Sequence, residues 1–159
     1  MDAIELLTKQ HRMMEAALER ALAAKTDERQ ERFQQAADVL MSHISIEERL
    51  FYPAVKARRT EDILLESLEE HLSLKRLIAD LVELPVDDEH FEAKLHVLEE
   101  QAEHHHEEEE EHLFPKVKKL LSSEELQQLG EQMQAMQVAI LADKPRALAA
   151  QQSDAAAEL

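Results

Sequence analysis

Two copies of the motif His-x-x-x-Glu are related by an offset of 62 residues, and each of these two copies lies in an apolar helical stripe. The copies are His43 with Glu47 and His105 with Glu109. Residues four positions apart share one face of an α-helix, and their neighbours at three-and-four spacing follow the pattern of a core-facing stripe. A buried His and Glu are costly unless a partner satisfies them. The repeat therefore predicts helices that enclose a metal ion.

The composition limits the fold and the kinds of metal ligand. Among 159 residues there are one Gly and four Pro, while Ala, Leu, Glu and Gln are abundant, which predicts an all-α protein. The length fits one domain with a hydrophobic core. The sequence has no Cys, so disulfides and thiolate ligands are excluded. Any bound metal must be held by imidazoles and carboxylates.

The charge of the chain argues against several classes of partner. A formal net charge of -17 does not suit binding to nucleic acid or to an anionic membrane surface. No apolar stretch is long enough to span a membrane. The first residues lack the basic region and the apolar region of a signal peptide. We therefore expect a soluble cytoplasmic protein.

The hydrophobic pattern predicts an antiparallel up-down four-helix bundle within residues 1–121, made of two repeated helical hairpins. Its helices are expected at about residues 2–25, 26–57, 60–83 and from about 88 past Val117. The segment Ile4–His11 resembles Leu64–His71, which supports the repeat. Ser122 and Glu125 have capping-box spacing and open a C-terminal helix, residues 122–142, packed on the bundle. Residues 143–159 form a tail that is either helical or frayed.

The predicted ligands can be compared by their depth in the bundle. For each pair of successive helices, we count the residues from each ligand to the turn that joins the two helices. At roughly 1.5 Å per residue, the two distances agree within about 6 Å. The single core His of the first and third helices therefore lies level with the two His-x-x-x-Glu motifs. The predicted metal ligands are His11, His43, Glu47, His71, His105 and Glu109.

Four imidazoles and two carboxylates suit iron, zinc or manganese better than calcium. Two carboxylates that face each other across a core repel unless a cation lies between them. If each carboxylate bridges two metals, each metal receives two His nitrogens and two carboxylate oxygens. A bridging oxo or hydroxo group then makes five ligands, and an octahedral ion keeps one position open for a small diatomic molecule or a peroxide.

These residues, with the segments Phe51-Tyr52-Pro53 and Leu113-Phe114-Pro115, resemble the hemerythrin-like HHE cation-binding family over about residues 2–142. The resemblance implies a centre of two non-haem iron ions bridged by Glu47 and Glu109. It also implies binding of dioxygen, peroxide or nitric oxide by a carrier, sensor, scavenger or iron-handling protein.

The sequence departs from the oxygen-carrying hemerythrins at two positions. Their third helix has a second His where this chain has Lys75, and their last carboxylate follows its His by five residues, whereas Glu109 follows His105 by four. One imidazole fewer leaves more open coordination. This favours chemistry with peroxide or nitric oxide over reversible oxygen carriage.

Other polar residues near the motifs have simpler interpretations. The remaining His and Glu of the segment Glu103–His112 are predicted to form a solvated face, with His106 and Glu110 as reserve ligands. Glu15 and Lys75 each follow a core His by four residues, so Glu15 is either an extra ligand or a partner of Lys75, or both lie at the boundary of the core. Tyr52 is expected to point partly away from Glu47. The histidines predicted to lie at the surface are His90 and His96.

The sequence leaves two functions open. The first is a di-iron protein that binds or reduces a small oxidant, with catalase-like or peroxidase-like turnover as one form. The alternative is a non-catalytic module that senses iron or oxygen, or that stores metal. A bundle without metal is the costliest to fold, because six polar groups would be buried with no cation. The sequence does not identify a protein partner.

Overall fold

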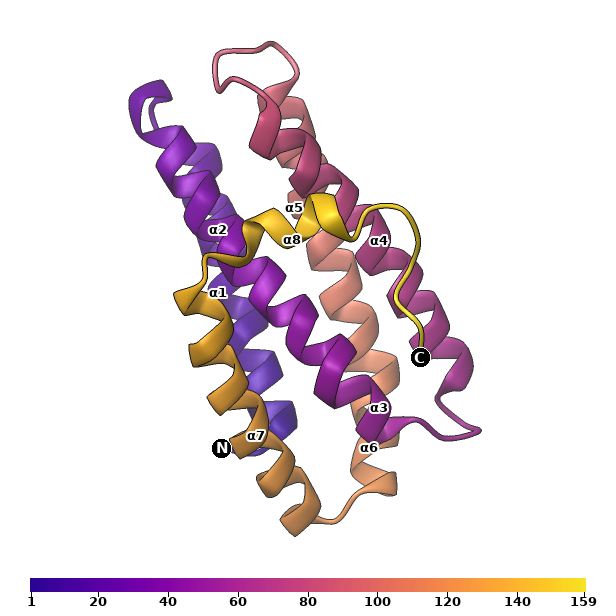
Figure 1. Cartoon of the computed structure of the whole chain (residues 1–159). Coiled ribbons are helices and arrows are strands. Elements are labelled where there is room, and N and C mark those ends of the chain that lie inside the picture. Colours follow the sequence, from indigo (N-terminus) through magenta and orange to yellow (C-terminus); the bar gives the residue numbers. More distant parts are fainter.

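The computed structural model describes all of residues 1–159, and it is a helical bundle with no β-strand, as predicted. The four helices of the bundle are α1 (Ala3–Ala23), α2 (Thr26–Ile46), α4 (Glu61–Glu83) and α5 (Phe91–Glu108). Two π-helical segments, Glu47–Phe51 and Glu109–Leu113, continue α2 and α5 into α3 (Tyr52–Val55) and α6 (Phe114–Leu120). Figure 1 shows these helices side by side, with their connections at the two ends of the bundle.

Three further elements cover the outside of the bundle. Helix α7 (Ser123–Ala142) packs against α1 and α2 and begins at the predicted capping box of Ser122 and Glu125. A 3₁₀ segment (Pro145–Ala147) and α8 (Leu148–Gln151) then cross α2 towards α4 (Figure 1). Arg76 donates hydrogen bonds to the carbonyls of Ser153 and Asp154 at 3.0 and 3.2 Å. The C-terminal residues are thus held against α4.

The helix ends differ in detail from the predicted ones. Helix α2 begins at Thr26, and Lys25 precedes it without a side-chain cap. Asp88 accepts a hydrogen bond from the backbone of His90, and α5 begins at Phe91. None of the helices combines the length and the hydrophobicity that crossing a bilayer requires.

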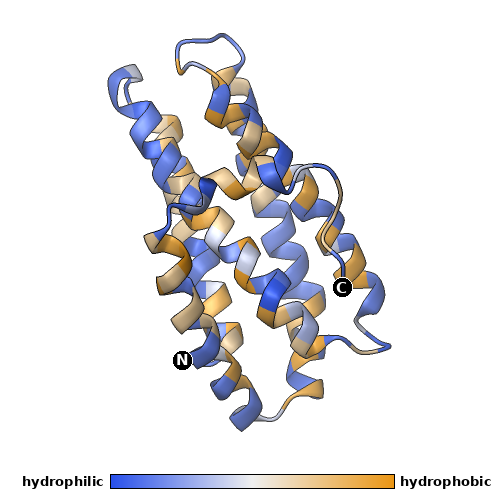
Figure 2. Cartoon of the chain, in the orientation of Figure 1, coloured by the Kyte–Doolittle hydropathy of each residue, from blue (hydrophilic) through white to orange (hydrophobic).

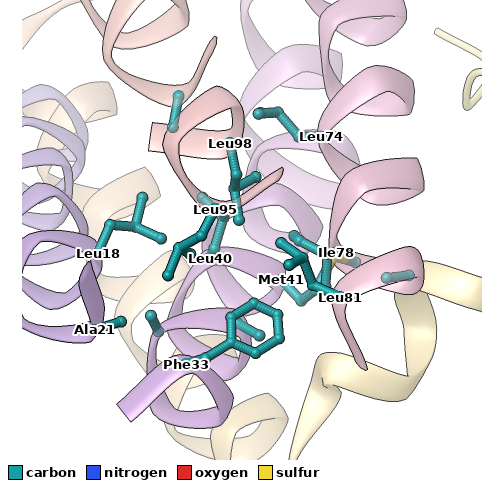
Figure 3. Close-up of a cluster of buried hydrophobic side chains, with 14 of the residues drawn as sticks. Leu18, Ala21, Phe33, Leu40, Met41, Leu74, Ile78, Leu81, Leu95 and Leu98 are labelled. Carbon is teal, nitrogen blue, oxygen red and sulfur yellow. The ribbon is translucent and has the colours of Figure 1, made fainter. Parts of the chain in front are cut away.

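The hydrophobic core consists of two clusters stacked along the bundle. Each helix carries both hydrophobic and hydrophilic residues along its length (Figure 2), as amphipathic helices do. The second cluster contains Leu7, Phe51, Val55, Leu64, Phe114 and Val117. The first cluster, shown in Figure 3, lies towards the α1–α2 and α4–α5 connections and contains Leu18, Phe33, Leu40, Met41, Leu74, Ile78, Leu81, Leu95 and Leu98.

The predicted ligands lie where these two clusters meet. In α1, His11 lies between Leu7 of the second cluster and Met14 of the first. The corresponding positions of α2, α4 and α5 are occupied by His43, His71 and His105. A polar layer therefore separates two apolar layers, and each of the four bundle helices contributes to it.

Each π-helical segment begins at the Glu of a His-x-x-x-Glu motif and precedes a Pro. The backbone N–H of Tyr52 bonds to the carbonyl of Glu47, five residues earlier, and Phe114 bonds to Glu109 in the same way. A Pro in a helix donates no hydrogen bond, and its ring clashes with the carbonyl four residues before it. The wider π turn accommodates Pro53 and Pro115 in this way, and such turns occur often at functional sites.

Gly130 is the only Gly of the chain, and it lies where α7 touches the start of α1. A Cβ at this position would lie 2.7 Å from the carbonyl carbon of Asp2 and 2.8 Å from the nitrogen of Ala3. We expect Gly130→Ala to lower the free energy of unfolding by about 1–3 kcal/mol, because backbone atoms must move apart, even though Ala favours helix more than Gly does. Thermal unfolding measures this, with the exposed Gln132→Ala as control. An unchanged or higher Tm would contradict the close packing.

Candidate metal centre

The structure brings all six predicted ligands together in the polar layer. Each of them is exposed by no more than 1 %. Ligand atoms of His11, His43, Glu47 and Glu109 lie within 4.8 Å of one another. A second group with the same spacing consists of Glu47, His71 and His105. The two groups share Glu47.

The two carboxylates lie between the imidazoles of different helices. Oε1 of Glu47 is 2.9 Å from Nε2 of His43, and Oε2 is 2.9 Å from Nε2 of His71. Oε1 of Glu109 is 3.4 Å from Nε2 of His11 and 3.3 Å from Nε2 of His105. Glu47 therefore directs its two oxygens towards two separate imidazoles, which is the arrangement a bridging carboxylate needs.

The outer nitrogen of each of these imidazoles, Nδ1, faces a side-chain oxygen. Carboxylate and amide oxygens accept hydrogen bonds, so in the neutral form of each ring Nδ1 carries the proton and the Nε2 lone pair points into the centre. Metal-binding histidines are commonly held in this way. The partners are Glu110 for His11 at 2.9 Å, Gln10 for His43 at 2.7 Å, Glu48 for His71 at 2.9 Å and Glu70 for His105 at 2.9 Å.

Several buried atoms of the centre have no hydrogen-bond partner. Lone pairs of imidazoles and carboxylates cannot satisfy one another, and leaving them bare in the interior is costly. A cation satisfies all of them at once, so the residues fit a metal centre. These unpartnered atoms are Nε2 of His11, His43 and His106 and Oε1 of Glu47 and Glu109.

Tyr52 points into the centre, so the expectation that it points partly away from Glu47 is wrong. Its hydroxyl lies 2.9 Å from Oε2 of Glu109 and 3.2 Å from both Oε2 of Glu47 and Nε2 of His71. A residue five positions after Glu47 lies far around an α-helix, but the π turn returns it to the same face. Burial and the two carboxylates raise the pKa of Tyr52 well above its ordinary value, so the phenol keeps its proton.

His106 belongs to the centre, whereas the periodicity placed it on the solvated face and kept it only as a reserve ligand. It is 1 % exposed, and its ring stacks on that of His11 at 4.0 Å between centroids. Adjacent residues differ by about 100° around a helix, and α5 packs against two neighbours. His105 therefore faces α4, while His106 faces α1. The sequence signal for this position was Glu15, which follows His11 by one helical turn. In the structure, Oε1 of Glu15 lies 3.2 Å from Nδ1 of His106.

The other reserve and boundary residues take outer positions. Glu110 lies on the outer side of His11, where it also pairs with Arg12. Lys75 is buried and pairs with Glu48 at 2.8 Å, so neither the predicted Glu15–Lys75 pair nor the boundary position of Lys75 is correct. The histidines His104 and His112, exposed by 65 % and 58 %, lie on the solvated face as predicted, and His90 and His96 are exposed.

The family profile described as Hemerythrin HHE cation binding domain matches residues 2–117. The chain belongs to the hemerythrin HHE cation-binding domain family. A solved structure of a protein described as containing a hemerythrin HHE cation binding domain, from Mycobacterium kansasii, is similar in fold, with a TM-score of 0.79 and 24 % sequence identity. The similarity covers 90 % of this chain and 89 % of that one. No curated protein matches the chain.

Charges within the HHE centre shift the pKa values of its imidazoles in both directions. Burial alone lowers the pKa of His105, but the carboxylates of Glu109, Glu47 and Glu70 outweigh it and raise this pKa well above its ordinary value. The pKa values of His11 and His71 are also raised, against burial, by neighbouring Glu side chains. Burial lowers the pKa values of His43 and His106.

We expect metal binding to this HHE domain to release protons and to strengthen as the pH rises. A metal binds the neutral imidazole, and the raised pKa values of His11, His71 and His105 keep these rings protonated to higher pH in the metal-free protein. Each displaced proton changes the affinity about tenfold per pH unit. The dissociation constant of Co(II) should therefore rise at least about tenfold from pH 7.5 to pH 6.5. The control variant His104→Ala should show the same change. Equal Co(II) affinity of the wild-type chain at pH 7.5 and pH 6.5 would contradict the prediction.

Proposed function

We propose that this protein is a non-haem di-iron protein that binds or reduces a small oxidant in the core of its bundle. The observation that carries the proposal is the position of Glu47, whose two oxygens lie 2.9 Å from imidazoles of two different helices. One ion alone does not account for a carboxylate that faces two ways. The fit to two ions, together with membership in a cation-binding family, supports a two-metal centre.

The residues divide naturally between two ions. His11 and His43 would hold one ion with Oε1 of Glu47, and His71 and His105 would hold the other with Oε2. Glu109 would lie between the two ions. Neutral imidazoles with carboxylates suit iron, and a bridging oxo or hydroxo group completes the proposed cofactor. When bound, iron supplies redox chemistry and an open coordination position.

The surrounding residues favour a small neutral guest. The polar layer lies between two apolar clusters, so a molecule that enters it leaves water behind. Tyr52 holds a proton 2.9 Å from Glu109, within the centre itself. Dioxygen, hydrogen peroxide and nitric oxide are small enough for such a site, and reduction of the first two needs protons.

The outer carboxylates fix the imidazoles and connect them to the surface. Glu48, Glu70 and Glu110 each accept a hydrogen bond from an Nδ1–H, which keeps the ring oriented with Nε2 inward. Burial opposes ionisation of Glu48 and Glu70, but the neighbouring His side chains, and Lys75 in the case of Glu48, lower both pKa values, so both side chains stay charged. These side chains are partly exposed, and protons can exchange with solvent through them.

Anaerobic loading with Fe(II) tests the proposal. We expect two irons per chain by elemental analysis after removal of excess metal. Addition of oxygen, hydrogen peroxide or nitric oxide should then change the near-ultraviolet spectrum. Catalytic loss of peroxide would support reduction of an oxidant. Stoichiometric binding without turnover would exclude catalytic reduction and would fit either simple oxidant binding or the sensing alternative. A chain that binds no iron would contradict both.

A further inference from the structure

We propose that His106 is a fifth imidazole ligand, which gives one ion three imidazoles and leaves the other with two. This inference rests on the proposed two-metal centre and adds that its two ions have different numbers of imidazole ligands. Ligand atoms of His106, His11 and His43 lie within 4.8 Å of one another. The other half offers only His71 and His105 with Glu47.

The hydrogen bonds of His106 determine which of its nitrogens faces the centre. Nδ1 lies 3.2 Å from Oε1 of Glu15, and a carboxylate oxygen accepts. Nδ1 therefore carries the proton, and Nε2 presents a bare lone pair. This atom is buried and has no hydrogen-bond partner, as is also true of Nε2 in His11 and His43. All three imidazoles thus direct Nε2 inward, which is the orientation that a metal requires.

Helix α4 supplies no second imidazole, because the residue one turn after His71 is Lys75. Lys75 instead pairs with Glu48 at 2.8 Å, outside the layer of inward nitrogens. The third imidazole comes from α5 and faces α1, so the ion with more ligands would lie on the side of α1 and α2.

Ligation needs a modest change in the His106 ring. The rings of His106 and His11 are nearly parallel, with an angle of 8° between their planes. A nitrogen lone pair lies in the plane of its ring, so two stacked rings reach one ion only when one of them tilts. The plane of the His106 ring is set by rotation about its Cβ–Cγ bond, which leaves the backbone of α5 in place.

The unequal number of imidazoles determines which ion would bind an oxidant. An ion with three imidazoles and two carboxylates has fewer open positions than an ion with two imidazoles. The less coordinated ion would be held by His71, whose Nε2 is 3.2 Å from the hydroxyl of Tyr52. A small oxidant should therefore bind on this side, next to the buried phenol.

Paramagnetic NMR of the Co(II)-loaded protein tests the assignment. The Nδ1–H proton of each ligating imidazole gives a strongly shifted resonance that disappears in D₂O. We expect five such resonances in the wild-type chain, one for each of His11, His43, His71, His105 and His106. In His106→Phe, which keeps a ring stacked on His11, we expect four, and one ion should bind about tenfold or more weakly. The matched control is His104→Phe, an exposed position on the same helix, which should leave all five.

The outcomes separate this inference from the proposed function. Two bound ions with only four shifted resonances in the wild-type chain would overturn the role of His106 and leave the two-metal centre standing. One bound ion would contradict the two-metal centre, and loss or retention of a resonance in His106→Phe would still decide whether His106 is a ligand. A wild-type chain that binds no Co(II) would overturn both. If His106→Phe does not fold, the wild-type count decides.

Discussion

Replacing Glu47 with alanine is expected to reduce the metal content from two ions per chain to one or none. The two oxygens of Glu47 face different imidazoles, His43 and His71, each at 2.9 Å. The substitution therefore removes one ligand from each ion at the same time. Elemental analysis of desalted, iron-loaded protein measures the effect. Glu109→Ala should act in the same direction, because Oε1 of Glu109 lies between His11 and His105.

The matched control for this substitution is Glu108→Ala. Glu108 precedes Glu109 in the chain, but its side chain is 44 % exposed and outside the centre. This variant should keep both ions. Retention of two ions by both Glu47→Ala and Glu109→Ala would rule out carboxylate bridging. Loss of metal in Glu108→Ala would show that the assay reports general damage to the fold.

Removal of metal from the loaded protein is expected to lower its Tm by about 10 °C. Without cations, five buried atoms of the centre lack partners, and two carboxylates lie within one small region. An ion that binds only the folded chain stabilises it by about 4 kcal/mol when its free concentration is about 1,000 times the dissociation constant. For a domain of this size, about 1 kcal/mol corresponds to about 2–4 °C. Scanning calorimetry with and without a chelator measures the difference.

A control variant separates metal binding from other effects of the chelator. Glu47→Ala should show a much smaller change in Tm on chelation, because it retains less metal. The exposed variant His112→Ala should respond as the wild-type chain does. The stabilising role of the metal fails if loaded and stripped wild-type proteins, with their metal contents verified, unfold at the same temperature.

The bundle and the level of the centre were predictable because they depend on periodicity and helix length. A rise of about 1.5 Å per residue converts sequence distance into depth, so spacing along the chain is enough to place His11, His43, His71 and His105 at one level. The two Glu residues follow from the same argument, since residues four apart share a helix face. The structure does bring these side chains together, although their role as ligands remains a prediction.

The positions of Tyr52 and His106 were not predictable by the same method. Regular α-helical periodicity turns Tyr52 away from Glu47, and only the π turn before Pro53 returns it. The prediction assumed that each helix has one inward face. In the structure α5 packs against both α1 and α4, so two of its faces are buried. For that reason His105 and His106 are both buried, although they are adjacent.

The sequence by itself determined the helices, their order and the depth at which His and Glu side chains interrupt the apolar stripes, because these features depend on local spacing along one chain. Only the tertiary structure decided which polar side chains meet across helices: Glu15 with His106, Glu48 with His71 and Lys75, and Glu70 with His105. Such contacts depend on the rotation of each helix about its own axis, and the packing of neighbouring helices sets that rotation.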